Sequence, residues 1–217
     1  LFNMRKLLPS PMHGDEKTIA AGKDGAPVEL GCSESEPTAA YVFKTIADPF
    51  VGRLSFFRVY SGRLAAGMTL VNARSGETEK IGKTLTVCGK KQTETPAICA
   101  GDIGAVAKMT TAKTGDTLCD AARVAALPRP VFPQPSLFMA VTVSKKGDEG
   151  KISGALARLM EEDQTLAYHT DSETKEQIIG GLGEQHLDVV TAKLKSKFGV
   201  EIGLAKPRIA YRESIRK

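Results

Sequence analysis

Four prolines fall within nine residues of this 217-residue chain, in the segment LPRPVFPQP at 127–135. Each proline fixes its backbone φ angle and lacks an amide donor, so neither a helix nor a sheet ladder can run through the segment. The chain is also longer than one typical domain of about 100–150 residues. We therefore expect two folded domains, joined by a proline-rich linker at residues 128–135.

Before this linker, the chain contains short segments rich in Val, Ile, Thr and aromatic residues, set apart by glycine-containing turns. These segments are AYVFKTIA, RLSFFRVY, MTLVNA, EKIGKTLTV and IGAVAKM. Strands that follow one another with no helical segment between them indicate a sandwich or a barrel. We expect this β domain to cover residues 38–127, and we interpret the turn-rich residues 1–37 as a linker or arm.

After the linker, the period of the hydrophobic pattern changes. The segments LFMAVTVS, LAYHTD, EQIIGG and VEIGLAK are typical of strands, whereas residues 148–163 and 184–198 each carry one apolar helical stripe. The stripe residues are Ile152, Leu156, Leu159 and Met160 in the first helix, and Leu187, Val190, Leu194 and Phe198 in the second. A helix buries such a stripe. The order β-α-β-β-α-β predicts a ferredoxin-like α+β domain over residues 136–217.

Charge and cysteine content narrow the classes of function. The net charge of +5 and the isoelectric point near 9.0 fit anionic partners such as nucleic acid. The four cysteines, Cys32, Cys88, Cys99 and Cys119, form no CxxC pair, and no histidine stands at a zinc-finger spacing. We therefore expect no metal site and no disulfide framework, and we place the chain in the reducing cytoplasm. The longest apolar stretch, LFMAVTV, is too short to span a membrane, so we expect no membrane association.

One segment nearly matches a phosphate-binding loop. In GETEKIGKT, residues 76–84, five residues separate Gly76 from Gly82 where the motif has four. The residues that follow are strand formers, so we expect a hairpin instead of the loop-to-helix turn that holds phosphates. The chain also has no DxxG and no NKxD motif. We therefore expect this chain by itself to bind no guanine nucleotide and to have no catalytic residue.

The segment GGLGEQH at 180–186 resembles the start of a dinucleotide fingerprint, but His186 stands where the third glycine belongs. We interpret it as a close turn into the second helix, with Glu184 suited to the helix N-terminus. On a helix, His186 points away from Glu184 and Asp188, so these three side chains cannot converge on a metal or a substrate.

Other polar groups are interpreted as solvated faces. They are the acidic end of the first helix, EEDQT at 161–165, and Lys193 and Lys197 on the second helix, although these lysines could meet phosphate. The first and third strands of the predicted ferredoxin-like sheet offer only Phe138 as an exposed aromatic residue. Recognition of single-stranded RNA by base stacking is therefore disfavoured.

Five sequence blocks in order resemble the second and third domains of the elongation factor G family, the GTPases that drive translocation on the ribosome. The blocks are residues 48–72, 100–120, 155–166, 180–189 and 206–215. Residues 7–11, LLPSP, resemble the connection that leaves the family's GTPase domain. The resemblance implies a translation-factor-type β-barrel followed by a ferredoxin-like βαββαβ domain.

In that family, the barrel packs on the GTPase domain and touches ribosomal RNA, and the third domain relays the nucleotide state to the last two domains. The resemblance therefore implies the middle section of a ribosome-dependent GTPase. Its expected partners are ribosomal RNA, small-subunit proteins, its own upstream GTPase domain and its downstream domains. GTP and Mg²⁺ are expected in a domain outside this chain, with no cofactor in the chain itself, and we expect a monomer.

Carried over residue by residue, the resemblance gives two sets of candidate site residues. Candidate contacts with phosphate or with a neighbouring domain are Arg53, Arg58, Arg63, Lys145 and Lys146. Residues that match the family's loop at the GTPase-domain interface, where fusidic acid binds, are Gly181, Gly183, Glu184 and His186. Arginine suits the first role because it keeps its charge and donates bidentately to phosphate.

Two departures and three alternatives accompany this interpretation. Gln185 replaces the usual leucine of the interface loop, and residues 87–96 differ from the corresponding segment of the housekeeping factor. In both features this chain resembles the divergent elongation factor G-like paralogues. Ribosomal protection proteins of the tetracycline-resistance type share the architecture. A stand-alone RNA-binding or ribosome-binding adaptor is a further alternative, and a small-ligand or enzymatic domain pair would need a polar pocket that no motif supplies.

Overall fold

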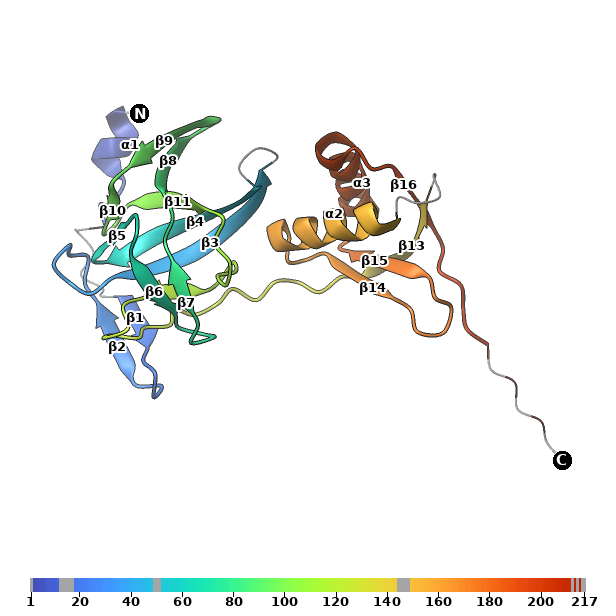
Figure 1. Ribbon diagram of the computed structural model, residues 1–217, viewed down its shortest axis with the longest axis horizontal. Helices are drawn as coiled ribbons and strands as arrows, with labels where there is room; N and C mark the ends of the chain where they lie inside the picture. Colours follow the sequence, from blue (N-terminus) through green and yellow to red (C-terminus); the bar gives the residue numbers. More distant parts are fainter. Residues whose placement is uncertain are drawn as a thin grey trace. The chain divides into compact units, whose positions relative to one another are not determined.

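The computed structural model divides the chain into two compact units, Leu1–Pro130 and Val131–Lys217, and the division lies within the proline-rich segment (Figure 1). The residues it describes are 2–11, 18–48, 52–143, 149–211, 213 and 215. No helix among these residues is long and apolar enough to cross a membrane.

The first unit is built almost wholly from strands, after one short helix, α1 (Phe2–Leu7). Its strands are β1 (Thr18–Ala21), β2 (Pro27–Leu30), β3 (Ala39–Asp48), β4 (Gly52–Ser61), β5 (Arg63–Ala65), β6 (Thr69–Asn72), β7 (Thr78–Lys80), β8 (Thr84–Cys88), β9 (Lys91–Thr95), β10 (Ala97–Cys99), β11 (Ile103–Ala107) and β12 (Thr117–Cys119). Eight of them form one antiparallel sheet in the order β7-β6-β12-β3-β4-β11-β8-β9, and β10-β5 and β1-β2 form two further pairs. Figure 1 shows the large sheet curling round its core, which is the predicted β-barrel.

Strand β4 shows why the sheet is covered on both sides. Phe57 and Val59 point into the central core and are fully buried. Leu54 and Phe56 alternate with them and join a second apolar cluster on the other face of the sheet, together with Leu85. Strand β4 therefore packs against apolar side chains on both of its faces.

The interpretation of residues 1–37 as a turn-rich linker or arm was incomplete. Residues 18–30 form the β1–β2 hairpin, whose Ala20 and Leu30 are buried in an apolar cluster with Leu127. The backbones of Ala21 and Ala126 exchange two hydrogen bonds of 2.8 and 2.7 Å, so the hairpin belongs to the first unit. Each strand buries so few apolar side chains that no alternating pattern is visible in the sequence.

The second unit has the predicted ferredoxin-like fold. Its elements are β13 (Leu137–Val143), α2 (Glu149–Glu162), β14 (Ala167–Thr170), β15 (Gln177–Gly181), α3 (Glu184–Phe198) and β16 (Ile202–Ala205). The strands form an antiparallel sheet in the order β14-β15-β13-β16, and both helices lie on one face of it (Figure 1). This is the strand order of the split βαβ arrangement.

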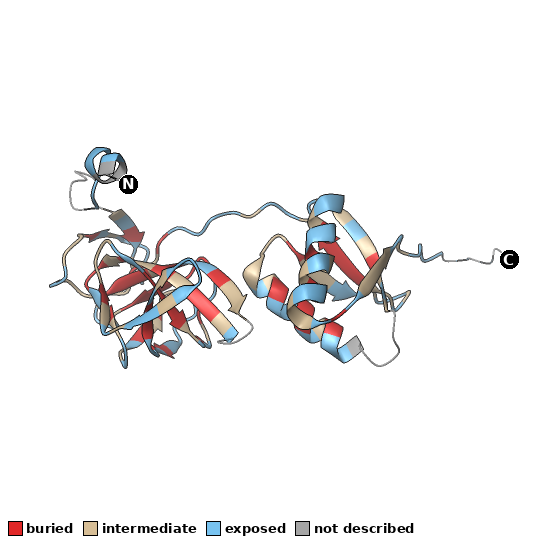
Figure 2. Cartoon of the chain, turned by 90° about the horizontal axis from the view of Figure 1, so that it is seen from above, coloured by how far each residue is buried: buried red, intermediate tan, exposed pale blue. Residues whose placement is uncertain are grey.

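One apolar core holds the helices of the second unit on the sheet. The predicted stripes face the strands, and of their residues only Met160 and Phe198 are partly rather than fully buried. Figure 2 shows the buried inner sides and exposed outer sides of α2 and α3. The packing brings the start of α3 next to the end of α2, where His186 contacts Asp163.

Candidate functional site

We call residues 180–186, which join β15 to α3, the glycine-rich loop. This loop is hydrogen-bonded to Ser136, the residue that follows the linker. The amide of Ser136 donates to the carbonyl oxygen of Gly181 at 3.0 Å. The hydroxyl of Ser136 donates to the carbonyl oxygen of Leu182 at 2.9 Å. A movement of the loop therefore acts directly on the residue that follows the last proline of the linker.

Close packing explains two glycines before the helix. A Cβ atom on Gly180 would lie 2.7 Å from the Phe138 ring, and a Cβ atom on Gly181 would lie 2.7 Å from Leu187. Both distances are shorter than real Cβ contacts, so larger residues would push the loop off the sheet. Gly183 precedes the helix with an extended φ of 167° and has open space around it, so nothing in the structure explains its identity.

His186 ties the loop to the end of α2. Its Nδ1 accepts the Leu182 amide at 3.0 Å, so the ring proton sits on Nε2 and is donated to Asp163 Oδ2 at 2.9 Å. Glu184 is exposed at the first turn of α3, where a negative charge suits the helix dipole. His186 and Glu184 therefore have different roles: of the two, His186 connects the loop to α2, whereas Glu184 lies at the start of α3.

Asp163 is an ionised acceptor in this arrangement. Burial alone would raise the pKa of its carboxyl group, but hydrogen bonds from the Thr165 hydroxyl and amide and from His186 lower that pKa below its usual value. The interpretation of EEDQT as a solvated face was wrong for Asp163. Its partner lies 23 residues away on another helix, at a separation that local periodicity does not reveal.

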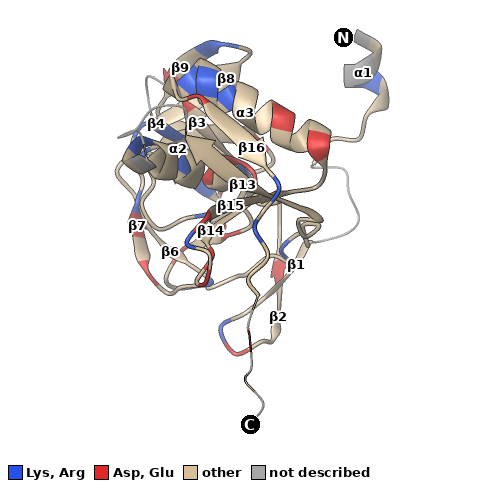
Figure 3. Cartoon of the chain, turned by 90° about the vertical axis from the view of Figure 1, so that its right-hand side faces the viewer, with Lys and Arg blue, Asp and Glu red and all other residues tan. Residues whose placement is uncertain are grey.

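Lys193 and Lys197 are also not simple solvated cations. Both ammonium groups contact Glu162, at 3.0 and 2.9 Å. Burial alone would raise the pKa of Glu162, but hydrogen bonds from the two lysines lower it. Figure 3 shows the division of α3 into an acidic start and a basic end. Because Glu162 neutralises much of this positive charge, Lys193 and Lys197 are poorer candidates for phosphate contacts than the sequence suggested.

The predicted arginines of the barrel occupy three different environments. Arg53 donates from Nη2 to the carbonyl oxygen of Ala112, within the first unit. Arg58 lies on β4 with its guanidinium 5.1 Å from the centre of the Tyr60 ring, and Arg63 is exposed on β5. Of the three, Arg63 is exposed, whereas Arg53 and Arg58 are partly buried. The predicted contacts Lys145 and Lys146 lie outside the described residues.

A buried carboxylate that the sequence analysis missed lies close to Arg53. Glu79 on β7 is 2% exposed and accepts five hydrogen bonds of 2.6–3.1 Å from the amides and hydroxyls of Thr110 and Thr111 and from the amide of Ala112. Burial alone would raise the pKa of Glu79, but these hydrogen bonds lower it. Glu79 therefore fixes the loop between β11 and β12.

Asp116 holds the other end of the same loop. It accepts hydrogen bonds from Asn72 at 3.0 Å, from the Lys113 amide at 3.0 Å, and from two nitrogens of Arg74 at 2.8 and 3.1 Å. Burial alone would raise the pKa of Asp116, but the bonds from Arg74 and Asn72 lower it. We call residues 108–116 the anchored loop.

The anchored loop also contacts the start of the linker through Arg129. Nη2 of Arg129 donates to the carbonyl oxygen of Thr114 at 3.2 Å, and its side chain lies against Gly115. The Tyr41 hydroxyl donates to the carbonyl oxygen of Pro128 at 3.5 Å. The linker is thus attached to the barrel at one end and to the glycine-rich loop, through Ser136, at the other.

Comparison with known proteins assigns both units. Residues 37–121 match the family model of elongation factor G domain 2, and residues 132–206 match the model of elongation factor G domain III. The chain belongs to the elongation factor G family. We therefore call Leu1–Pro130 domain II and Val131–Lys217 domain III. The resemblance seen in the sequence is confirmed for both domains.

A solved structure agrees with this assignment. The crystal structure of a protein from Thermus thermophilus is similar to this chain with a TM-score of 0.71 and 30% identity. The similarity covers 84% of this chain and 27% of that protein. The chain therefore spans only part of the length of a protein that it resembles.

In domain II, residues 76–84 do not form a phosphate-binding loop, as the sequence predicted. Gly76 lies in the turn between β6 and β7, and Thr84 begins β8, so a strand follows where the motif needs a helix. Across the described parts of both domains, no three His, Cys, Asp or Glu side chains are grouped to hold a metal ion. Residues 76–84 therefore lack the loop-to-helix shape that holds phosphate groups.

Proposed function

We propose that this chain is the middle section of a ribosome-dependent translational GTPase of the elongation factor G type. In this role, domain II contacts ribosomal RNA and small-subunit proteins, and domain III relays the state of a GTPase domain during translocation. The proposal places GTP and Mg²⁺ in that upstream domain, outside this chain. It describes a cytoplasmic monomer with no membrane partner.

The observation that carries the proposal is the double attachment of the glycine-rich loop. Ser136 joins the loop to the linker, and His186 joins it to Asp163 at the end of α2. A partner that shifts the loop therefore acts on the linker and on a helix of domain III at once. Gly181, Gly183, Glu184 and His186 are the residues that we propose face the GTPase domain.

The linker is suited to passing on such a shift. At its start, Pro128 accepts a hydrogen bond from Tyr41 and Arg129 bonds to the anchored loop. Directly after its end, Ser136 bonds to the glycine-rich loop. The segment between them, residues 130–135, contains three prolines. Proline-rich segments are extended and stiff, so a displacement at one end is transmitted rather than absorbed.

The ribosomal contact can be tested by sedimentation of the 217-residue chain with small ribosomal subunits at several salt concentrations. We expect weak binding that falls steeply with salt, because phosphate contacts release counterions. The double variant Arg58→Ala, Arg63→Ala should bind less and show a salt slope shallower by about one to two.

A matched control removes the same charge elsewhere in domain II. Lys23 and Lys80 are exposed, so the double variant Lys23→Ala, Lys80→Ala should keep most of the binding and nearly the original slope. Equal losses in the two double variants would show that only net charge matters. Such a result would contradict the assignment of Arg58 and Arg63.

A further inference from the structure

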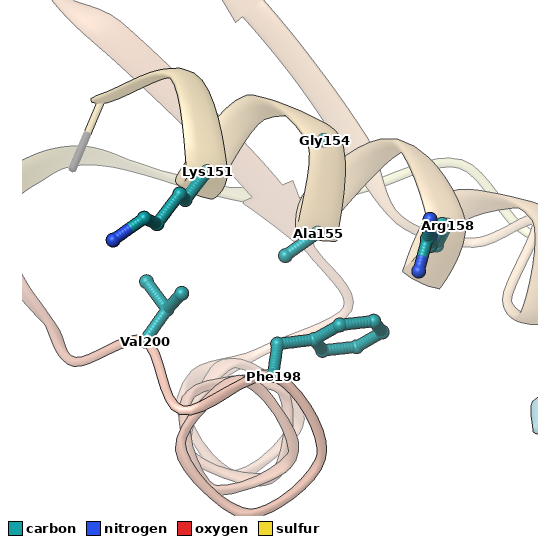
Figure 4. Close-up of a pocket in the computed structure, with 6 residues that line it drawn as sticks. All are labelled: Lys151, Gly154, Ala155, Arg158, Phe198 and Val200. Carbon is teal, nitrogen blue, oxygen red and sulfur yellow. The ribbon is translucent and has the colours of Figure 1, made fainter. Parts of the chain in front are cut away.

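A hollow of about 280 Å³ lies between α2 and the end of α3, away from the glycine-rich loop (Figure 4). Its lining residues are Lys151, Gly154, Ala155, Arg158, Phe198 and Val200. The four residues from α2 follow the spacing i, i+3, i+4, i+7, so they share one face of that helix. The hollow exists because the middle two, Gly154 and Ala155, are small.

The apolar wall opposite α2 is set by how α3 ends. Gly199 adopts the left-handed φ of 65°, and its amide bonds to carbonyl oxygens of the last turn of α3. The Val200 amide then donates to the Leu194 carbonyl oxygen at 3.2 Å, which turns Val200 back over the helix end. Ala155 and Val200 are buried and Phe198 is partly buried, so this wall is formed before any ligand arrives.

Positive charge lies at both ends of the hollow. Lys151 and Arg158 are seven residues apart, which separates their backbones by about 10 Å along the helix. Both side chains appear at the rim in Figure 4. The carboxylate of Glu162, one turn further along α2 than Arg158, contacts Lys193 and Lys197. The hollow is therefore complementary to an apolar group that carries negative charge beside it.

We propose that this hollow binds a short acidic segment of a partner protein. An apolar side chain of the segment fills the space over Ala155, Phe198 and Val200, and neighbouring carboxylates meet Arg158 and Lys151. The volume lies just below the range of about 300–1,000 Å³ that is usual for small-molecule sites, so one side chain with its neighbours suits it better than a cofactor. This partner is separate from the ribosomal RNA proposed for domain II.

A protein segment fits the hollow better than RNA does. Bases bind by stacking on open, flat aromatic surfaces. Here Phe198 forms one wall beside the aliphatic Ala155 and Val200, and the space between them suits a branched side chain. RNA binding at these residues is therefore an outcome that would overturn the proposal.

The test is an NMR titration of the isotopically labelled 217-residue chain with the peptide acetyl-Glu-Leu-Glu-amide. We expect saturable shifts at the amides of Ala155, Arg158 and Val200, with a dissociation constant on the order of millimolar, as befits a ligand this small. The neutral peptide acetyl-Gln-Leu-Gln-amide should bind about fivefold more weakly, because it lacks the charge-assisted contacts.

Two variants of α2 separate a built site from general stickiness. A Cβ atom on Gly154 meets nothing within 4 Å, so Gly154→Gln should fold, and its side chain should weaken binding at least about tenfold by occupying the hollow. Gly150→Gln is the matched control, because Gly150 lies on the same helix in equally open space but does not line the hollow. It should bind the peptide as the unchanged chain does.

Three results would each overturn the proposal. The first is the absence of saturable shifts at the hollow when the acidic peptide is added. The second is equal binding of the charged and neutral peptides, or equal weakening by Gly154→Gln and Gly150→Gln. The third is a hexauridylate oligonucleotide that shifts the same amides at a lower concentration than the peptide does.

Discussion

Domains II and III place their polar interactions in opposite ways. All the fully buried polar and charged side chains among the described residues belong to domain II, including Glu79 and Asp116. The buried side chains of domain III are apolar, and its two main polar contacts, His186 with Asp163 and Glu162 with two lysines, are partly exposed at the edge of the fold.

The difference indicates a division of labour. A buried polar network is costly to leave unsatisfied, so the anchored loop of domain II opens only with much of the domain. Contacts that water can reach break at lower cost, so the glycine-rich loop of domain III can shift while its apolar core stays packed. In the function that we propose, domain II serves as a platform, and domain III carries the part that responds to a partner.

The largest expected effect comes from removing Glu79. Glu79→Ala leaves the amides and hydroxyls of the anchored loop without their acceptor, and we expect domain II to lose about 3–4 kcal/mol of its free energy of unfolding. The chain has no tryptophan, so urea unfolding should be followed by NMR signals of each domain. Glu77→Ala, at an exposed position, is the control. A loss below about 1 kcal/mol for Glu79→Ala would remove the basis for calling domain II a platform.

Protonation of the buried carboxylates at low pH should lower the stability of domain II by less than Glu79→Ala does. The folded-state pKa of Glu79 lies below its ordinary value of 4.5, and that of Asp116 lies below 3.8. Such carboxylates contribute stability that is complete above the unfolded pKa and lost as the pH falls through the folded pKa. We expect the urea midpoint of domain II to be flat above about pH 5 and to fall below it, with a shallower fall in Glu79→Gln. Equal slopes in both proteins would show that Glu79 is not the group titrating.

A smaller effect is expected from the contact between the loop and α2. His186→Ala removes the acceptor of the Leu182 amide and the donor to Asp163, and it should cost domain III about 1–2 kcal/mol. Hydrogen exchange at the Leu182 amide should accelerate about tenfold, while exchange in domain II stays unchanged. His169→Ala changes an exposed histidine outside the loop and serves as the control. If His169→Ala accelerates the Leu182 amide equally, His186 does not hold the loop.

The smallest effect is expected at the linker. Ser136→Ala removes the hydroxyl bond to Leu182 but keeps the backbone bond to Gly181, so the expected cost is about 0.5–1 kcal/mol. Exchange should rise at the start of α3 with little change in the global stability of domain III. Ser153→Ala removes a hydroxyl from α2 and should leave that region unaffected. The linker is not coupled to the loop if both variants give the same exchange pattern.

The fold was predictable from the sequence where periodicity is long enough to be visible. Helix α3 begins and ends at the predicted residues, because four apolar side chains mark its stripe. Strands β5, β10 and β12 were missed, since three residues cannot show alternation. The segment 79–87 was interpreted as one strand, but it includes parts of β7 and β8.

The candidate site was predictable only in part. The family motif located the glycine-rich loop, and the helical wheel correctly separated His186 from Glu184. The contact of His186 with Asp163 depends on how two helices pack, which neither motif nor spacing encodes. Arg53 has the residue type of a phosphate contact, yet the fold directs it to the carbonyl oxygen of Ala112. Ser136 carries no sequence signal at all.

The most direct test of the platform and the relay is hydrogen exchange on the intact protein that contains this chain, bound to ribosomes with either GDP or a non-hydrolysable GTP analogue. We expect exchange at residues 180–186 and at the end of α2 to differ between the two nucleotides, and exchange in the anchored loop to stay the same. Nucleotide-dependent exchange in the anchored loop, with none in the glycine-rich loop, would contradict the account.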